Sequence, residues 1–231
     1  MHPLLAELLD LLLPMHCAGC GRTGGGCWCE RCRRGTGPVR TVGRQGGMPG
    51  TLAAGHYSGP LRAALLAYKE RGRRELVAPL AEMLVAALLD AGPVTGLGPL
   101  DSRWWFVPAP SRARAVRARG GDHMLGLTRR VAETLAGPLA EIGGSAGVSA
   151  PLRIRRGARD SVGLDAAARS ANLRGRVALR DADLPPPGAV VVLVDDVVTT
   201  GATLRGCADA LASAGCPVRG ALVLCDATTN R

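Results

Sequence analysis

The chain has 231 residues, enough for one full domain with a small appendage, and no apolar run reaches the roughly 18 residues that a membrane-spanning helix needs. Its 29 Lys and Arg against 19 Asp and Glu give a formal net charge of +10 and a pI near 10.0, which favours polyanionic partners such as nucleic acid, an anionic membrane or phosphorylated small molecules. Because Lys69 is the only lysine, the arginine excess is equally consistent with the base composition of the gene.

The first segment, residues 1–14, reads MHPLLAELLDLLLP. It has the apolar content of a secretory signal, but it lacks a basic start, and Glu7 and Asp10 interrupt the apolar run. We therefore expect an amphipathic helix that ends at Pro14, in a chain that stays in the cytoplasm. In that reducing compartment the eight cysteines are expected to be metal ligands or core residues rather than disulfides.

A stretch rich in cysteine and glycine follows, with the sequence CAGCGRTGGGCWCERC. It contains two CxxC pairs, Cys17 with Cys20 and Cys29 with Cys32. Paired CxxC motifs present four thiolates to one tetrahedral Zn²⁺, which predicts a structural zinc ribbon. Cys27 could replace Cys29 as a ligand. We prefer Cys29 because it forms a CxxC pair with Cys32. A redox CxxC needs only one pair and a thioredoxin-like setting, which the sequence lacks.

The next stretch, TGPVRTVGRQGGMPGT, has the composition of a linker. We therefore divide the chain into an N-terminal helix and zinc ribbon over residues 1–36, a linker over 37–51 and a main domain over 52–231.

The main domain alternates expected strands and helices, which predicts an α/β fold with a mostly parallel sheet flanked by helices. In chain order we first expect a short strand after residue 52, helices over Pro60–Arg71 and Leu76–Leu89, and a strand in RWWFVPAP. A helix in GDHMLGLTRRVAETLA should follow and end at Gly137 and Pro138, before a long functional loop over 143–176 with one short helix near 164–172. The last expected elements are a buried strand in GAVVVLVDD, a helix over Ala202–Ala214 and a buried strand in VRGALVLC.

The stretch VVLVDDVVTTGAT, residues 191–203, carries the clearest chemical pattern. In an open α/β sheet ligands bind outside the carboxyl ends of the strands, where Asp195 and Asp196 are expected. Successive strand residues face opposite sides, so we expect at least one aspartate to leave the strand and face the crevice. The free backbone N–H groups at the start of the next helix suit a phosphate, and carboxylates accept hydrogen bonds from a sugar diol. Ribose 5-phosphate has both groups. The alternative is that the aspartates are a solvated strand end and that Thr199 or Thr200 is a simple N-cap of the next helix.

All thirteen residues of this stretch resemble the phosphoribosyl pyrophosphate (PRPP) motif of type I phosphoribosyltransferases. The resemblance implies that Asp195 and Asp196 hold the ribose hydroxyls and are the catalytic acids. It also implies that the following loop binds the 5-phosphate, with contributions from Val198, Thr199, Thr200, Gly201, Ala202 and Thr203. The fold expected from it is the type I phosphoribosyltransferase fold, and Mg²⁺ is expected to accompany PRPP.

A zinc ribbon followed by a phosphoribosyltransferase fold resembles the ComF family of bacterial proteins, which are associated with competence and the use of external DNA. The similarity extends over LLDLLLPMHCAGCG, GHYSGPLRAALLAYKERG, VPAPSRARAVRARGGDHMLGL and RDSVGLDAAARSANLRGRVAL. One departure is local. Where the family usually reads Arg-Gly-Phe-Asn-Gln, this chain reads Arg-Gly-Gly-Asp-His over residues 119–123.

Arginines on two segments are candidates for the pyrophosphate end of PRPP, because preorganised cations stabilise the charge that develops when pyrophosphate leaves. Arg112 and Arg114 follow the turn VPAPS directly. The remaining candidates lie in the long loop, which we expect to close over the site as a hood that excludes water, and they are Arg155, Arg156, Arg159 and Arg169.

The sequence leaves two functions open. The first is a Mg²⁺-dependent phosphoribosyltransferase with PRPP as donor and an unidentified acceptor. The second is a binding protein that senses PRPP, or an accessory protein of DNA uptake that contacts single-stranded DNA or uptake proteins.

Overall fold

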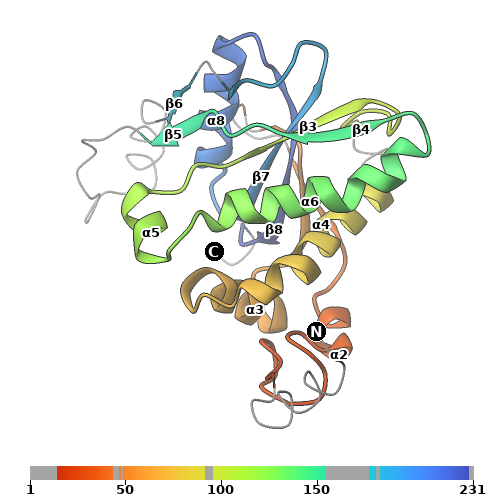
Figure 1. Ribbon diagram of the computed structural model, residues 1–231, viewed down its shortest axis with the longest axis vertical. Helices are drawn as coiled ribbons and strands as arrows, with labels where there is room; N and C mark the ends of the chain where they lie inside the picture. Colours follow the sequence, from red (N-terminus) through yellow and green to blue (C-terminus); the bar gives the residue numbers. More distant parts are fainter. Residues whose placement is uncertain are drawn as a thin grey trace, which may run out of the picture.

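A mostly parallel sheet forms the centre of the molecule (Figure 1). The computed structural model describes residues 15–43, 47, 49–91, 96–154, 177–180 and 183–228. Among these, six strands pair in the order β1-β2-β8-β7-β3-β4, and β1 is the one antiparallel member. The strands of this sheet are β1 (Arg40–Val42), β2 (Thr51–His56), β3 (Arg103–Pro108), β4 (Ser145–Val148), β7 (Val190–Val198) and β8 (Val218–Asp226). The helix expected over residues 1–14 lies outside the described residues.

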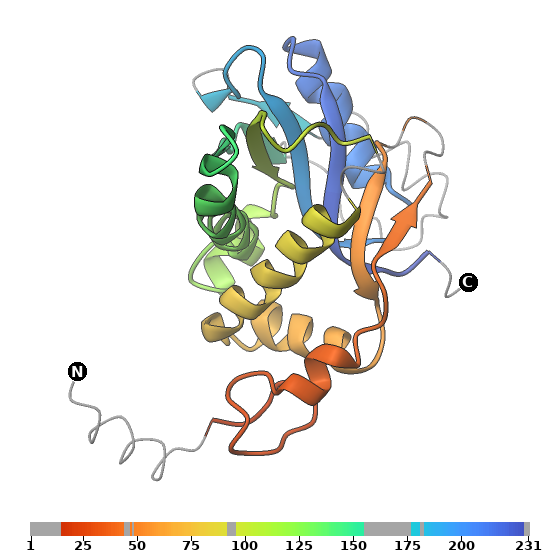
Figure 2. The same cartoon turned by 90° about the vertical axis from the view of Figure 1, so that its right-hand side faces the viewer.

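Helices cover both faces of the sheet, as the buried strand pattern requires (Figure 2). One face packs against α3 (Gly59–Glu70), α4 (Val77–Ala91) and α6 (His123–Ala140), and the other packs against α8 (Ala202–Ser213). The remaining described elements are α2 (Glu30–Arg34), η1 (Arg74–Leu76), α5 (Ala113–Ala118) and the hairpin of β5 (Leu152–Ile154) with β6 (Val177–Leu179). Within the described residues no helix is both long and apolar enough to span a bilayer.

Strand β7 owes its central position to an apolar run whose two sides are both buried. Val192 and Val194 join the core under α3, α4 and α6, whereas Val191 and Leu193 join the core under α8. This alternation follows from the two-residue period of a strand, and burial on both faces explains why the run is continuously apolar. The expected fold class, an α/β domain with a mostly parallel sheet flanked by helices, is thereby confirmed.

Two expectations for the middle of the chain are wrong. Helix α6 does not end at Gly137 and Pro138 but continues to Ala140. Pro138 lies in the last turn, where its missing N–H removes one bond from a helix that is already ending. The stretch 143–176 is also not one loop, because it begins with β4 and β5. Ser145–Val148 has no β-typical apolar pattern, and its pairing with the exposed edge of β3 decides its conformation.

The cysteine-rich segment packs directly against the main domain. Cys17, Trp28 and Cys32 are almost fully buried and share one apolar core with α3, α4 and α6. Arg33 forms an ion pair of 2.8 Å with Glu82 of α4. The stretch expected as linker contains β1, which extends the sheet at the edge of β2. The ribbon therefore lies beneath α3 in both views (Figures 1 and 2).

Candidate functional site

Both aspartates of the acidic pair lie within β7, close to its carboxyl end. The strand continues to Val198, because β8 stays paired with it as far as Asp226. The expectation that one aspartate leaves the strand is therefore wrong. The two side chains instead point to opposite faces of the sheet, as strand geometry requires. Asp196 contacts residues from α3 and α6, while Asp195 lies on the α8 side.

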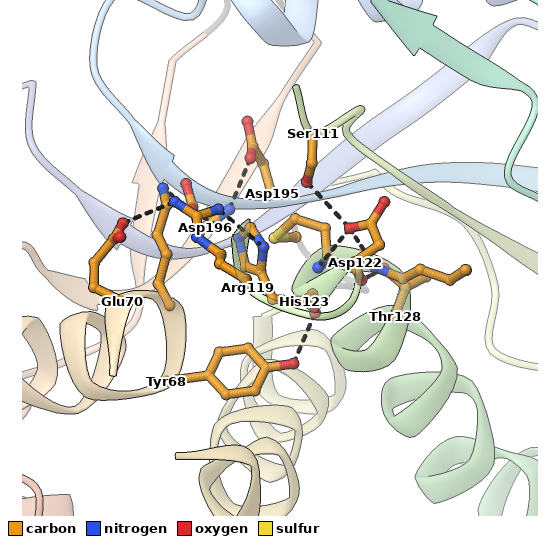
Figure 3. A network of polar contacts seen from close by, with 12 residues as sticks. Tyr68, Glu70, Ser111, Arg119, Asp122, His123, Thr128, Asp195 and Asp196 are labelled. Carbon is orange, nitrogen blue, oxygen red and sulfur yellow. Dashed lines mark hydrogen bonds and ion pairs between the residues drawn. The ribbon is translucent and has the colours of Figure 1, made fainter. Parts of the chain in front are cut away.

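Asp196 is the centre of a polar network that joins three elements (Figure 3). Lys69, at the end of α3, donates to Asp196 Oδ2, and His123 Nε2 at the start of α6 lies 3.5 Å from the same oxygen. Burial alone would raise the pKa of Asp196, but the hydrogen bond from His123 and the ammonium of Lys69 outweigh it and lower that pKa. Asp196 is thus held as a carboxylate although its residue is only 8% exposed.

The network continues from His123 to the molecular surface. Arg119 Nη1 lies 3.5 Å from His123 Nδ1, and Arg119 Nη2 donates to Glu70 Oε1 at 2.8 Å. Tyr68 donates its hydroxyl to the His123 carbonyl at 2.7 Å, which fixes the start of α6 against α3. The chain of contacts from Glu70 to Asp196 therefore couples an exposed carboxylate to a buried one.

Asp195 has the opposite electrostatic character. Burial, and then the negative charge of Asp196, raise the pKa of Asp195 to about 7. A hydrogen bond of 2.8 Å from the Asp196 backbone N–H to Asp195 Oδ1 lowers the pKa of Asp195, but by less than burial and the charge of Asp196 raise it. The two adjacent carboxyl groups thus differ in protonation near neutral pH.

The loop after β7 exposes hydrogen-bonding groups at the start of α8. Gly201 adopts a left-handed conformation with φ 68° and precedes the first residue of α8. Thr199 and Thr200 are exposed at the carboxyl end of the sheet, and the Thr200 hydroxyl accepts from Ala202 N at 3.4 Å. Backbone N–H groups at the start of a twelve-residue helix and two exposed hydroxyls are the groups that a phosphate needs.

The arginine candidates divide into placed and unplaced residues. Arg112 and Arg114 lie at the start of α5, after the turn that follows β3. That turn lies at the same end of the sheet as the aspartates, because Ala109 N donates to Val194 O at 2.8 Å. The four hood candidates, Arg155, Arg156, Arg159 and Arg169, lie outside the described residues.

Sequence reasoning missed the residues that face Asp196 from the helices. Lys69 and His123, which contact it directly, are 127 and 73 positions away along the chain. Arg119, which contacts His123, is four positions before that histidine. One feature of the sequence singles out Lys69: it is the only lysine among 29 basic residues, in a chain that otherwise uses arginine throughout.

A cavity of about 390 Å³ opens beside this network. Its walls come from the end of α3, the start of α4 and the segment between α5 and α6, and they include Lys69, Arg119 and His123. A second cavity, of about 350 Å³, lies past Asp122, which lines both. It is bounded by the turn after β3 and by Arg117 and Arg153. Asp122 itself caps α6 by accepting from Met124 N and Leu125 N.

The four cysteines of the two CxxC pairs converge on one point. The sulfur atoms of Cys17, Cys20, Cys29 and Cys32 all lie within 4.8 Å of one another. Cys20 and Cys29 Sγ are 3.8 Å apart, which is the separation that four Zn–S bonds of about 2.3 Å impose in a tetrahedron. Cys27 is not part of this group, and its thiol faces the Glu75 carbonyl at 3.7 Å. The cluster fits a structural zinc site with Cys29 as the fourth ligand.

The electrostatics of the cluster also favour a cation. Burial would raise the pKa of Cys17, but N–H groups, including those of Cys29 and Gly19 at 3.3 and 3.4 Å, outweigh it and lower that pKa to about 6. The pKa of Cys32 is raised to about 12, first by burial and then by the neighbouring thiols. A bound metal ion would favour the thiolate form of all four cysteines, and its charge would offset the repulsion between them.

Comparison with known proteins agrees with the topology. Residues 159–231 match the family model of the phosphoribosyl transferase domain. A curated relative, DNA utilization protein YhgH of Salmonella typhi, is 32% identical over 160 residues, which cover 69% of this chain. The aligned part spans 64% of that protein's own length.

Solved structures show a more distant similarity. One is the asparagine mutant from an analysis of an invariant aspartic acid in HPRTs, which is 15% identical, with 67% of this chain and 68% of that chain covered and a TM-score of 0.34. Trypanosoma cruzi hypoxanthine phosphoribosyl transferase is also 15% identical, with 65% and 64% covered and a TM-score of 0.32.

The zinc site yields a test with a matched pair of cysteines two residues apart. Cys29→Ser removes a ligand and is expected to abolish stoichiometric zinc and lower the melting temperature, because the ribbon shares its core with α3 and α4. Cys27→Ser is expected to keep zinc. Elemental analysis measures the zinc content of both variants, and thermal unfolding measures their melting temperatures. Retained zinc in Cys29→Ser would contradict the ligand assignment.

The raised pKa of Asp195 predicts a pH-dependent stability difference. A carboxyl group whose pKa is higher in the folded state stabilises it below the unfolded value, and this contribution is lost as the pH rises through about 7. Asp195→Asn should therefore be more stable than the wild type at pH 8, with the difference shrinking toward pH 5. Urea unfolding across this range checks it, with the exposed Asp209→Asn as control. A difference that does not vary with pH would count against the raised pKa.

Proposed function

Because this chain is of the ComF type and its carboxyl-terminal part matches the phosphoribosyl transferase domain, we propose that it binds PRPP and transfers the phosphoribosyl group to an acceptor with release of pyrophosphate. The observation that carries the proposal is the end of β7. There, one ionised carboxylate and one of raised pKa stand directly before an anion-binding turn at the start of α8. A sugar diol and a 5-phosphate on one ligand match these two parts in order.

In this proposal Asp195 and Asp196 bind the ribose hydroxyls. The turn formed by Val198, Thr199, Thr200, Gly201, Ala202 and Thr203 binds the 5-phosphate through backbone N–H groups and hydroxyls. Lys69 and His123 hold Asp196 ionised and oriented, so they act as positioning residues. The acceptor's attacking atom forms a bond to C1 of the ribose while the C1–O bond breaks. The electron pair of the broken C1–O bond leaves with pyrophosphate.

Cations near the leaving group are the second requirement of this chemistry. Arg112 and Arg114 start α5 at the same end of the sheet, and Arg117 and Arg153 line the cavity beside the turn after β3. We assign the pyrophosphate to this side, with the hood arginines Arg155, Arg156, Arg159 and Arg169 as further candidates. Mg²⁺, when bound with PRPP, would supply additional neutralisation of the pyrophosphate charge. We place the protein in the reducing cytoplasm, where cysteines serve as metal ligands or core residues rather than in disulfides.

PRPP binding is testable without knowledge of the acceptor. Asp196→Asn removes charge-assisted hydrogen bonds to the diol, each worth about 1.5–3 kcal/mol, so PRPP with Mg²⁺ should bind about tenfold more weakly or worse. Asp209→Asn, exposed on α8, should bind as the wild type does. Calorimetry makes the comparison, and an absence of heat with the wild type would overturn the site. Heat without pyrophosphate release from any nucleobase would favour a PRPP sensor over an enzyme.

The relative's name, DNA utilization protein, and the net charge of +10 favour a second candidate. In it the protein is an accessory of DNA uptake or use that binds single-stranded DNA through its arginines. Such binding releases counterions, so the affinity for an oligo-dT should fall steeply between about 50 and 200 mM salt and depend little on sequence. Fluorescence anisotropy measures it. Failure to bind at low salt would leave the positive charge without a nucleic-acid role.

A further inference from the structure

The cavity of about 390 Å³ beside Asp196 is not used by any group of PRPP in the function proposed above. Its volume is within the range of about 300–1,000 Å³ typical of small-molecule sites. Two of its wall residues, Lys69 and His123, are the two side chains that contact Asp196 Oδ2. A ligand in the cavity would therefore lie one side chain away from the carboxylate that holds the ribose.

Part of the cavity wall is apolar, as a ring-shaped ligand requires. Val77 and the ring of Tyr68, whose hydroxyl is already bonded to His123 O, provide apolar walls. Two glycines keep the space open. A Cβ on Gly126 would lie 3.4 Å from the Tyr68 hydroxyl, and one on Gly121 would lie 3.6 Å from Arg74 NH2.

The charges of the cavity suit a single carboxylate. Its described lining residues include three cations (Lys69, Arg74 and Arg119) and two carboxylates (Glu70 and Asp122). Lys69 is already paired with Asp196, so the two arginines are the cations that face a ligand. Arg119 already binds a carboxylate, Glu70, at 2.8 Å, and the Glu70 side chain is 52% exposed. A ligand carboxylate could take the place of Glu70 at the guanidinium, which binds such groups through two parallel hydrogen bonds. A pyrophosphate, with several negative charges, is disfavoured by the two acidic walls.

We propose that this cavity is the acceptor site and that the acceptor is a planar nitrogen heterocycle with one carboxylate, held by Arg119. The proposal rests on the function proposed above. In the reaction the lone pair of a ring nitrogen forms the bond to C1, and the C1–O bond breaks with its electron pair going to pyrophosphate. A ring N–H proton, where the acceptor has one, passes to water. The coupled contacts of Arg119, His123 and Asp196 orient the acceptor relative to the ribose.

The test compares acids with a neutral analogue on the full-length, zinc-loaded protein. Pyridine-3-carboxylate and uracil-6-carboxylate are titrated calorimetrically beside pyridine-3-carboxamide. At least one acid should bind, and the amide should bind about tenfold more weakly than its acid, because it cannot form the charged pair with Arg119. Inorganic pyrophosphate should leave acid binding unchanged. Acid and amide of equal affinity, no binding of either acid, or displacement of the acid by pyrophosphate would each overturn the proposal.

Variants assign the binding to the cavity. Arg119→Met should weaken acid binding about tenfold or more, and Arg119→Lys should weaken it less because the charge remains. Arg130→Met is the matched control, since Arg130 also forms an exposed ion pair with a glutamate, Glu133, but lies on α6 outside the cavity lining. Melting temperatures of all three show that the fold is intact. Equal affinities in Arg119→Met and Arg130→Met would place the acid elsewhere and overturn the assignment.

PRPP calorimetry on the same preparation distinguishes failure of the acceptor assignment from failure of the proposed function. If PRPP binds and neither acid does, the acceptor assignment fails and the PRPP site remains. If an acid binds through Arg119 and PRPP does not, the acceptor role fails together with the proposed function.

Discussion

The ionised carboxylate of Asp196 is the constraint on which the rest of the site depends. A charge that is nearly removed from water is unfavourable unless it is paired and hydrogen-bonded. The pairing here comes from the ends of two helices, with Lys69 at the carboxyl end of α3 and His123 at the amino end of α6. Because removal of either partner would leave a buried charge incompletely compensated, the carboxylate fixes where both helices meet the carboxyl end of β7. The cavity beside it exists because those helix ends are held there.

The cysteine-rich segment packs against the helices that position this site. Its buried residues share a core with α3 and α4, and Arg33 binds Glu82 of α4. A segment of this size has too little apolar surface to fold alone, so a metal ion bound by its four cysteines would provide the order that lets it pack against α3. The end of α3 carries Lys69 and Glu70, which contact the buried carboxylate and the cavity arginine. The ribbon is therefore connected to the site through one helix.

The sequence was sufficient to predict those features that depend on residues close together in the chain. The continuous apolar run of β7, the glycine turn after it and the CxxC spacing predicted a strand, a helix start and a metal cluster, because each depends on residues close in sequence. The contact between Lys69 and Asp196 spans 127 positions and has no local signature. Strand β4 was missed because Ser-Ala-Gly-Val forms a strand only by pairing with β3. The end of α6 was missed because a proline in a last turn costs little.

Adjacent positions on β7 give the two aspartates different chemistry, and this difference bears on how a sugar could be held. One faces the cations of α3 and α6 and stays ionised, while the other faces the α8 side, where burial raises its pKa to about 7. Near neutral pH Asp195 is then partly protonated, so it can donate as well as accept, whereas Asp196 can only accept. A vicinal diol has two hydroxyls, each of which donates and accepts. One protonated and one ionised carboxyl group match such a diol better than two carboxylates, since a second charge would repel both the first and the phosphates of the same ligand.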